Sequence, residues 1–136
     1  LLKIRIANDD IQSLEVRRLE RVSGEDVKRC YQCGNCSGGC PVSYAMEIPP
    51  TKVMRFLQLG NIEDVRNANT MWLCVGCLQC YSRCPQGVSV AAILEGLRQE
   101  VLRKGASKTE VRDVPFPFLK KAPQQAIVCG FRKFVG

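Results

Sequence analysis

Eight of the nine cysteines in this chain fall into two copies of one pattern, Cys-x2-Cys-x2-Cys-x3-Cys-Pro. The first copy is CYQCGNCSGGCP at residues 30–41, and the second is CVGCLQCYSRCP at residues 74–85. This spacing is typical of bacterial proteins that hold two four-iron clusters through cysteine thiolates. Three closely spaced thiolates wrap one cluster, whereas the fourth lies beyond the loop, next to a proline that turns the chain away.

The spacing therefore predicts that each motif lends its fourth cysteine to the cluster of the other motif. The predicted ligands are Cys30, Cys33, Cys36 and Cys84 for cluster 1, and Cys74, Cys77, Cys80 and Cys40 for cluster 2. Two clusters tied across the chain would brace a small core, as a structural metal does. Glycines in both loops let the backbone approach the sulfurs, where amide N–H groups can donate hydrogen bonds.

Other uses of the cysteines fit the pattern less well. Disulfides need a secreted context, which nothing in the sequence indicates, and the short Cys-x2-Cys pairs would close very small loops. Zinc sites usually show two Cys-x2-Cys pairs rather than triplets followed by Cys-Pro. The ninth cysteine, Cys129, is interpreted as a small, half-buried apolar residue, and its role stays open.

Composition excludes several classes of chemistry. The chain has no histidine, so catalysis by Ser-His-Asp or Cys-His groups is absent. It also has no glycine-rich nucleotide motif and no paired catalytic carboxylates. The formal net charge of +7 falls to about +3 if each oxidised cluster with its thiolates carries about −2. Because the cations are scattered and not interleaved with aromatic residues, we expect no nucleic-acid partner.

Hydrophobic periodicity indicates a mainly α fold with a dicluster domain at residues 23–106. Helix signals include the Ser23/Asp26 pair before Cys30, Pro50 followed by apolar residues, and Asn61 before IEDVRNA. The best pattern is VAAILEGLRQEVLRKG, which Ser89 caps. Residues 1–22 are interpreted as an N-terminal arm that starts with an extended LKIRI segment. Residues 107–136 are interpreted as an extended C-terminal arm, since prolines flank Phe116.

A resemblance to a known family rests on two stretches. CYQCGNCSGGCPVSYAMEIPPTKVMRFLQLG and MWLCVGCLQCYSRCPQGVSVAAILEGLR resemble the C subunit of heterodisulfide reductase and its bacterial relatives. The similarity covers about residues 25–104 and includes all eight motif cysteines. It implies the α-helical ferredoxin fold, with two 4Fe–4S clusters. The two arms match nothing in that family.

The resemblance also implies a non-catalytic electron-transfer role. In that family, the C subunit passes electrons between the A subunit, which holds flavin and iron–sulfur clusters, and the B subunit, which handles a disulfide. Two alternatives are a free-standing dicluster ferredoxin and the iron–sulfur subunit of another flavin- or quinone-linked oxidoreductase. Free carriers are usually strongly acidic, whereas this chain is basic. No transmembrane segment or secretory signal is visible, so we expect a cytoplasmic protein whose partners provide any membrane association.

Overall fold

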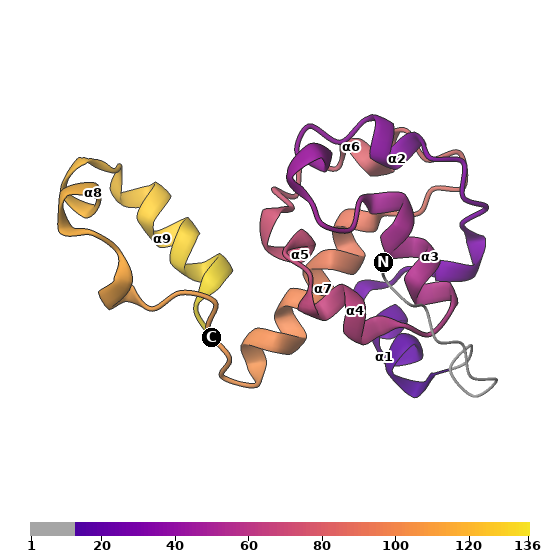
Figure 1. Ribbon diagram of the computed structural model, residues 1–136, viewed down its shortest axis with the longest axis horizontal. Coiled ribbons are helices and arrows are strands. Elements are labelled where there is room, and N and C mark those ends of the chain that lie inside the picture. The colour runs from indigo at the N-terminus through magenta and orange to yellow at the C-terminus, as the bar shows by residue number, and fades with distance from the viewer. Residues whose placement is uncertain (1–12) are drawn as a thin grey trace. The chain divides into compact units, whose positions relative to one another are not determined.

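The structure is a computed structural model that describes residues 13–136 of the chain. Within that range the regular elements are helices and no strand occurs, which confirms the mainly α fold (Figure 1). The predicted extended segment LKIRI lies outside the described residues. The chain divides into two compact units, Leu1–Leu97 and Arg98–Gly136. The division lies nine residues before the domain end expected at residue 106 and falls within one helix.

The first unit contains the helices that carry the cysteine motifs. In chain order these are α1 (Leu14–Ser23), the 3-10 turn η2 (Val27–Arg29), α2 (Asn35–Gly38), the 3-10 turn η3 (Ser43–Ala45), α3 (Pro50–Gln58), α4 (Ile62–Asn67), α5 (Thr70–Leu73), α6 (Gln79–Ser82) and α7 (Val90–Arg103). The last of these continues into the second unit. No helix among the described residues is long and apolar enough to cross a membrane.

The core of the first unit forms from one apolar stripe on each of its longer helices. Apolar residues three and four positions apart lie on one helix face, so α3 and α7 can each bury a continuous stripe. The fully buried side chains of this core include Leu19, Val53, Met54, Leu57, Val65, Met71, Ile93, Leu94 and Leu97. The apolar face predicted for the helix VAAILEGLRQEVLRKG is confirmed as buried from Val90 to Leu97, whereas Val101 and Leu102 on the same face are only half-buried.

Several predicted helix ends are confirmed, and one is corrected. Pro50 is the first residue of α3, and Ser89 Oγ accepts a hydrogen bond from Ala92 N–H at 3.2 Å at the start of α7. The expected cap at Ser23 is wrong, because Ser23 is the last residue of α1. Asp26 caps η2 instead, accepting from Lys28 N–H at 2.9 Å. A short polar side chain caps only when the residues after it turn into a helix.

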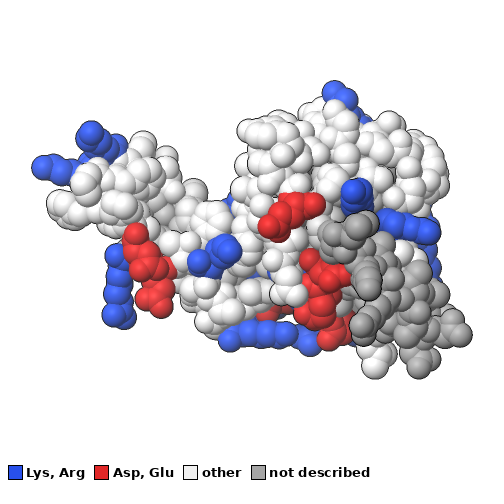
Figure 2. Space-filling view, in the orientation of Figure 1, with Lys and Arg blue, Asp and Glu red and all other residues white. Residues whose placement is uncertain are grey.

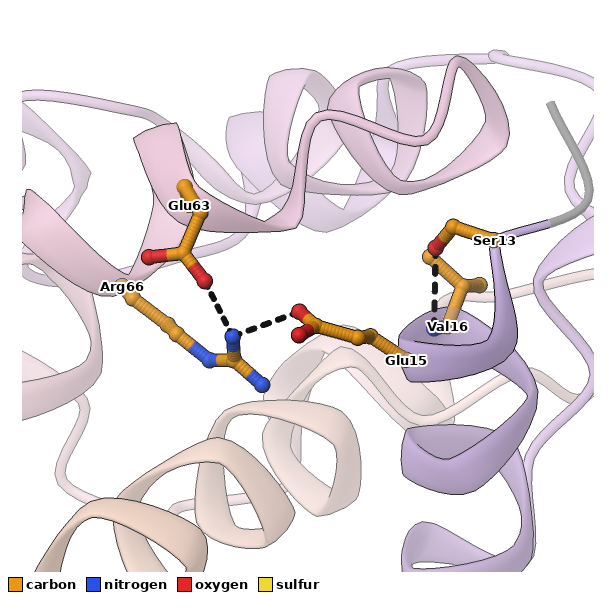
Figure 3. Close-up of polar contacts among 5 residues, drawn as sticks. All are labelled: Ser13, Glu15, Val16, Glu63 and Arg66. Carbon is orange, nitrogen blue, oxygen red and sulfur yellow. Dashed lines mark hydrogen bonds and ion pairs between the residues drawn. The ribbon is translucent and has the colours of Figure 1, made fainter. Parts of the chain in front are cut away.

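The described part of the N-terminal arm packs into the core instead of standing outside it. Ser13 caps α1 through Val16 N–H at 3.2 Å, and Leu19 is 0% exposed. Arg66 of α4 pairs with Glu63 and with Glu15 of α1 (Figure 3). The spacing of the apolar residues Val16 and Leu19 places both on one helix face. That signal was available in the sequence, but the charged residues around it favoured an arm.

The extended C-terminal arm predicted for residues 107–136 is wrong over most of its length. The second unit contains the 3-10 turn η4 (Val111–Asp113), α8 (Phe116–Lys121) and α9 (Gln124–Phe134). Pro115 and Pro123 immediately precede the two helices, and Pro117 lies in the first turn of α8. Proline is compatible with a first turn because the N–H it lacks has no partner within the helix there. These prolines begin helices and do not prevent them.

Thr70 gives a test of the packing that supports the motifs. Its buried hydroxyl donates to Ile48 C=O at 2.9 Å and accepts from Ile48 N–H at 3.1 Å, which fixes the chain after the first motif to α5. We expect Thr70→Val to lower the free energy of unfolding by about 1–3 kcal/mol, because two buried backbone groups lose their partner. Anaerobic chemical denaturation measures this, with Thr109→Val as the matched control. An equal loss in both variants would contradict the assignment.

Candidate metal centre

The two cysteine loops share one backbone conformation although their residues differ. In each loop the second cysteine lies between two residues with positive φ. The first loop has Gln32 at 66° and Gly34 at 85°, and the second has Gly76 at 67° and Leu78 at 59°. A residue with a Cβ is strained in this left-handed region, and glycine is not. Because each loop contains one strained residue, something beyond local preference must hold the shape.

A single helical turn follows each loop and carries the third cysteine. In α2 the N–H of Gly38 donates to Gly34 C=O at 3.0 Å, and in α6 the N–H of Ser82 donates to Leu78 C=O at 3.1 Å. The fourth cysteine comes just after each turn, followed by proline. α2 and α6 pack against each other, so the two motifs meet at equivalent positions (Figure 1).

The eight motif cysteines gather around two cavities, each of which receives three cysteines from one motif and the fourth from the other. Cavity 1 is lined by Cys30, Cys33, Cys36 and Cys84. Cavity 2 is lined by Cys40, Cys74, Cys77 and Cys80. Their volumes, including the open mouths, are about 320 and 360 Å³. These are the two sets that the spacing predicts. The half-buried position interpreted for Cys129 is wrong, because this residue lies exposed on α9 of the second unit.

The rest of each cavity wall is largely apolar, with Met54 and Val88 in cavity 1 and Met46 and Leu94 in cavity 2. In residues 13–136 no three acidic, histidine or cysteine side chains are close enough to share one metal ion. The four cysteines of each cavity instead line a space wider than a single metal ion needs. A four-iron cluster takes four cysteine thiolates, so the donor set at each cavity fits this group.

Burial and neighbouring sulfurs raise the pKa of two of the motif cysteines. Burial raises the pKa of the Cys30 thiol, and the neighbouring Cys36 and Cys84 raise it further, although a hydrogen bond from the Gln32 backbone opposes this. Burial likewise raises the pKa of Cys80, against hydrogen bonds from the backbone of Ala91 and Tyr81. A cationic metal centre at each cavity would oppose these effects at Cys30 and Cys80, because positive charge favours the thiolate.

The two motif segments carry positive rather than negative side chains, and a backbone N–H group reaches one of the motif sulfurs. Residues 27–46 and 70–94 contain no aspartate or glutamate, and their cations are Lys28, Arg29 and Arg83. Figure 2 accordingly shows the surface around α2 and α6 without acidic atoms on the face in view. Val88 N–H also donates to Cys84 Sγ at 3.3 Å. Such groups stabilise an anionic cluster.

Gly39 and Arg83 occupy equivalent places in the two motifs, directly before the fourth cysteine, and they lie in contact. A Cβ at Gly39 would stand 2.5 Å from Arg83 Cδ. The glycine therefore makes room for the arginine side chain to cross from one motif to the other. The sequence predicted Gly39 only as a loop residue, but aligning the two motifs would have paired it with Arg83.

Comparison with known proteins agrees with this geometry. Residues 26–88 match the family model of the 4Fe-4S dicluster domain, and they include both motifs. Within these residues the chain therefore matches a 4Fe–4S dicluster domain. The prediction of two 4Fe–4S clusters is thereby confirmed, whereas the assignment of each cysteine to a cluster stays a prediction.

The chain is also similar to the C subunits of heterodisulfide reductases, as its motifs predicted. It is 38% identical over 79 residues to the iron-sulfur C subunit of the CoB--CoM heterodisulfide reductase of Methanopyrus kandleri, covering 58% of this chain and 41% of the relative. It is 34% identical over 109 residues to the C 2 subunit of that enzyme from Methanocaldococcus jannaschii, covering 77% and 58%. A third relative is the C subunit of the ferredoxin:CoB-CoM heterodisulfide reductase of Methanosarcina mazei, 32% identical over 102 residues, covering 75% and 63%. The chain thus spans about half the length of these relatives.

Gly34 and Gly38 test whether the left-handed backbone supports the site. Neither position has an atom within 4 Å of an added Cβ, but only Gly34 has a positive φ. We expect Gly34→Ala to destabilise the cluster-loaded protein by about 1–2 kcal/mol through backbone strain. Gly38→Ala should be neutral or stabilising, since alanine favours the helical turn. Anaerobic denaturation measures both, and equal effects at the two positions would contradict the explanation.

Proposed function

We propose that this chain is an electron-transfer subunit of a heterodisulfide reductase-like complex, carrying electrons through two clusters. The observation that carries the proposal is the pair of adjacent cavities, each lined by four cysteines drawn from both motifs. The helical turns α2 and α6, which carry Cys36 of cavity 1 and Cys80 of cavity 2, pack against each other, so the two cavities are neighbours. Two neighbouring redox groups in one small domain are suited to passing electrons in sequence.

Cluster 1 would be held by Cys30, Cys33, Cys36 and Cys84, and cluster 2 by Cys74, Cys77, Cys80 and Cys40. The clusters supply one-electron oxidation and reduction when bound. The chain supplies the rest. Its cysteine thiolates would bind the irons, and the apolar cavity walls would limit the access of water to the clusters. Arg83 and the Val88 N–H group would offset negative charge near the cysteine ligands. With four cysteines committed at each cavity, we assign no catalytic residue to this chain.

The partners we propose are an A subunit with flavin and iron–sulfur clusters and a B subunit that handles a disulfide. The support is the similarity to proteins named as C subunits of heterodisulfide reductases. Exposed aromatic side chains within the motifs suit such contacts, since Tyr31 is 58% exposed and Tyr81 is 50% exposed.

A tagged pull-down under anaerobic conditions tests the proposed role. We expect about eight irons per chain, four-iron signals in the electron paramagnetic resonance spectrum of the reduced sample, and co-purified flavin-containing and disulfide-handling subunits in fixed stoichiometry. The same clusters on a protein that elutes alone would overturn the complex in favour of a free carrier. Zinc in place of iron would overturn the cluster assignment itself.

Single Cys→Ser variants test which cysteines share a cluster. We expect Cys84→Ser to alter the same resonance signal as Cys30→Ser, and Cys40→Ser to alter the same signal as Cys74→Ser, because a ligand change acts on the cluster it binds. Cys129→Ser is the matched control and should leave both signals unchanged. If Cys40→Ser and Cys30→Ser altered the same signal instead, each motif would hold its own cluster and the crossed assignment would be wrong.

A further inference from the structure

Two hydroxyl groups connect a motif cysteine to the first turn of α3. The N–H of Thr51 donates to Ser37 Oγ at 2.8 Å. The hydroxyl oxygens of Ser37 and Thr51 are 2.8 Å apart, and Thr51 Oγ1 lies 3.3 Å from Cys36 Sγ. The contacts form a continuous path from the N-terminal end of α3, through Ser37 in α2, to a cysteine that lines cavity 1.

The direction of each hydrogen bond follows once Cys36 is a thiolate. A thiolate has no proton, so Cys36 Sγ can only accept, and Thr51 must donate its single hydroxyl proton to the sulfur. Thr51 Oγ1 then has only lone pairs for Ser37, so Ser37 donates to Thr51. Ser37 Oγ in turn accepts the backbone N–H of Thr51, which has no intrahelical partner at this helix end. Every donor in the path is used once.

The equivalent position in the second motif is different. Thr51 and Ala91 are both the second residue of the helix that follows their motif. At Ala91 the backbone N–H donates directly to Cys80. At Thr51 the backbone N–H goes to Ser37, and the side-chain hydroxyl contacts the cysteine instead. The donor to Cys36 is therefore a side chain, which a substitution can remove, whereas the donor to Cys80 belongs to the backbone.

We propose that Thr51, oriented by Ser37, is a positioning residue that raises the reduction potential of the cluster in cavity 1. The proposal rests on the assignment of Cys36 as a ligand of that cluster under the proposed function. A hydrogen bond to a ligating sulfur stabilises the added negative charge of the reduced state more than the oxidised state. A cluster held at cavity 1 would therefore be easier to reduce with the Thr51 hydroxyl present than without it.

Thr51→Val tests the proposal because valine keeps the shape and removes the hydroxyl. Redox titration followed by electron paramagnetic resonance should show cluster 1 reduced at a lower potential, with its reduction equilibrium constant lower by about tenfold, or 59 mV for one electron. Cluster 2 is the internal control and should keep its potential. Thr51→Ser, which retains the hydroxyl, should restore most of the wild-type potential. Ser37→Ala should lower it by less than Thr51→Val, since the donor to the sulfur remains.

The iron content of each sample shows whether a negative result refutes the role of Thr51 or the proposed function itself. Two clusters with an unchanged potential in Thr51→Val would overturn the role of Thr51 while leaving the proposed function intact. Equal shifts in Thr51→Val and Thr51→Ser would also overturn it, since the hydroxyl would not be the cause. If Thr51→Val lost cluster 1, Thr51→Ala would replace it, and the same criteria would apply. A wild-type protein without two four-iron clusters would instead refute the proposed function.

Discussion

The crossing of the fourth cysteines is the constraint on which the first unit depends. Cys84 must reach the cavity of the first motif, and Cys40 must reach the cavity of the second. The two loops therefore have to lie side by side, and the packing of α2 on α6 achieves this. Helix α3 follows Cys40 and helix α7 follows Cys84. Each helix buries an apolar stripe in the core, which holds the chain in place after each motif. Bound clusters would add cross-links between segments far apart in the sequence, which stabilises a small core.

The two motifs share one backbone conformation, but the side chains and hydrogen-bond donors around their cysteines differ. Glycine and a strained residue exchange places around the second cysteine of each loop, and Gly39 faces Arg83. Thr51 and Ala91 reach their cysteines through different donors. Because the potential of a cluster depends on hydrogen bonds and nearby charge, these differences would give clusters at the two cavities different reduction potentials under the proposed function.

Sequence reasoning succeeded where one local pattern has one structural solution, and failed where neighbouring segments decide. The eight cysteines, the helix at residues 90–103 and the start of α3 at Pro50 followed from spacing and helix signals. The C-terminal prolines were misread, since the same residue either interrupts a helix or begins one depending on the residues that follow. Ser23 was misread for the same reason. The contacts of Thr51 left no signal in the sequence, because a threonine in a first helical turn is common.

The sequence by itself determined the cofactor and the helical class. Three cysteines spaced three apart and followed by Cys-Pro indicate a four-iron cluster, and that spacing is visible without a fold. The tertiary structure brought the two predicted sets of cysteines to two cavities and decided which other groups surround each cavity. It also decided that α1 packs onto the core through Val16 and Leu19. The physical reason is distance along the chain. Ligand type is a local property of the residues, whereas hydrogen-bond donors such as Thr51 and cations such as Arg83 reach their places only when separate segments pack together.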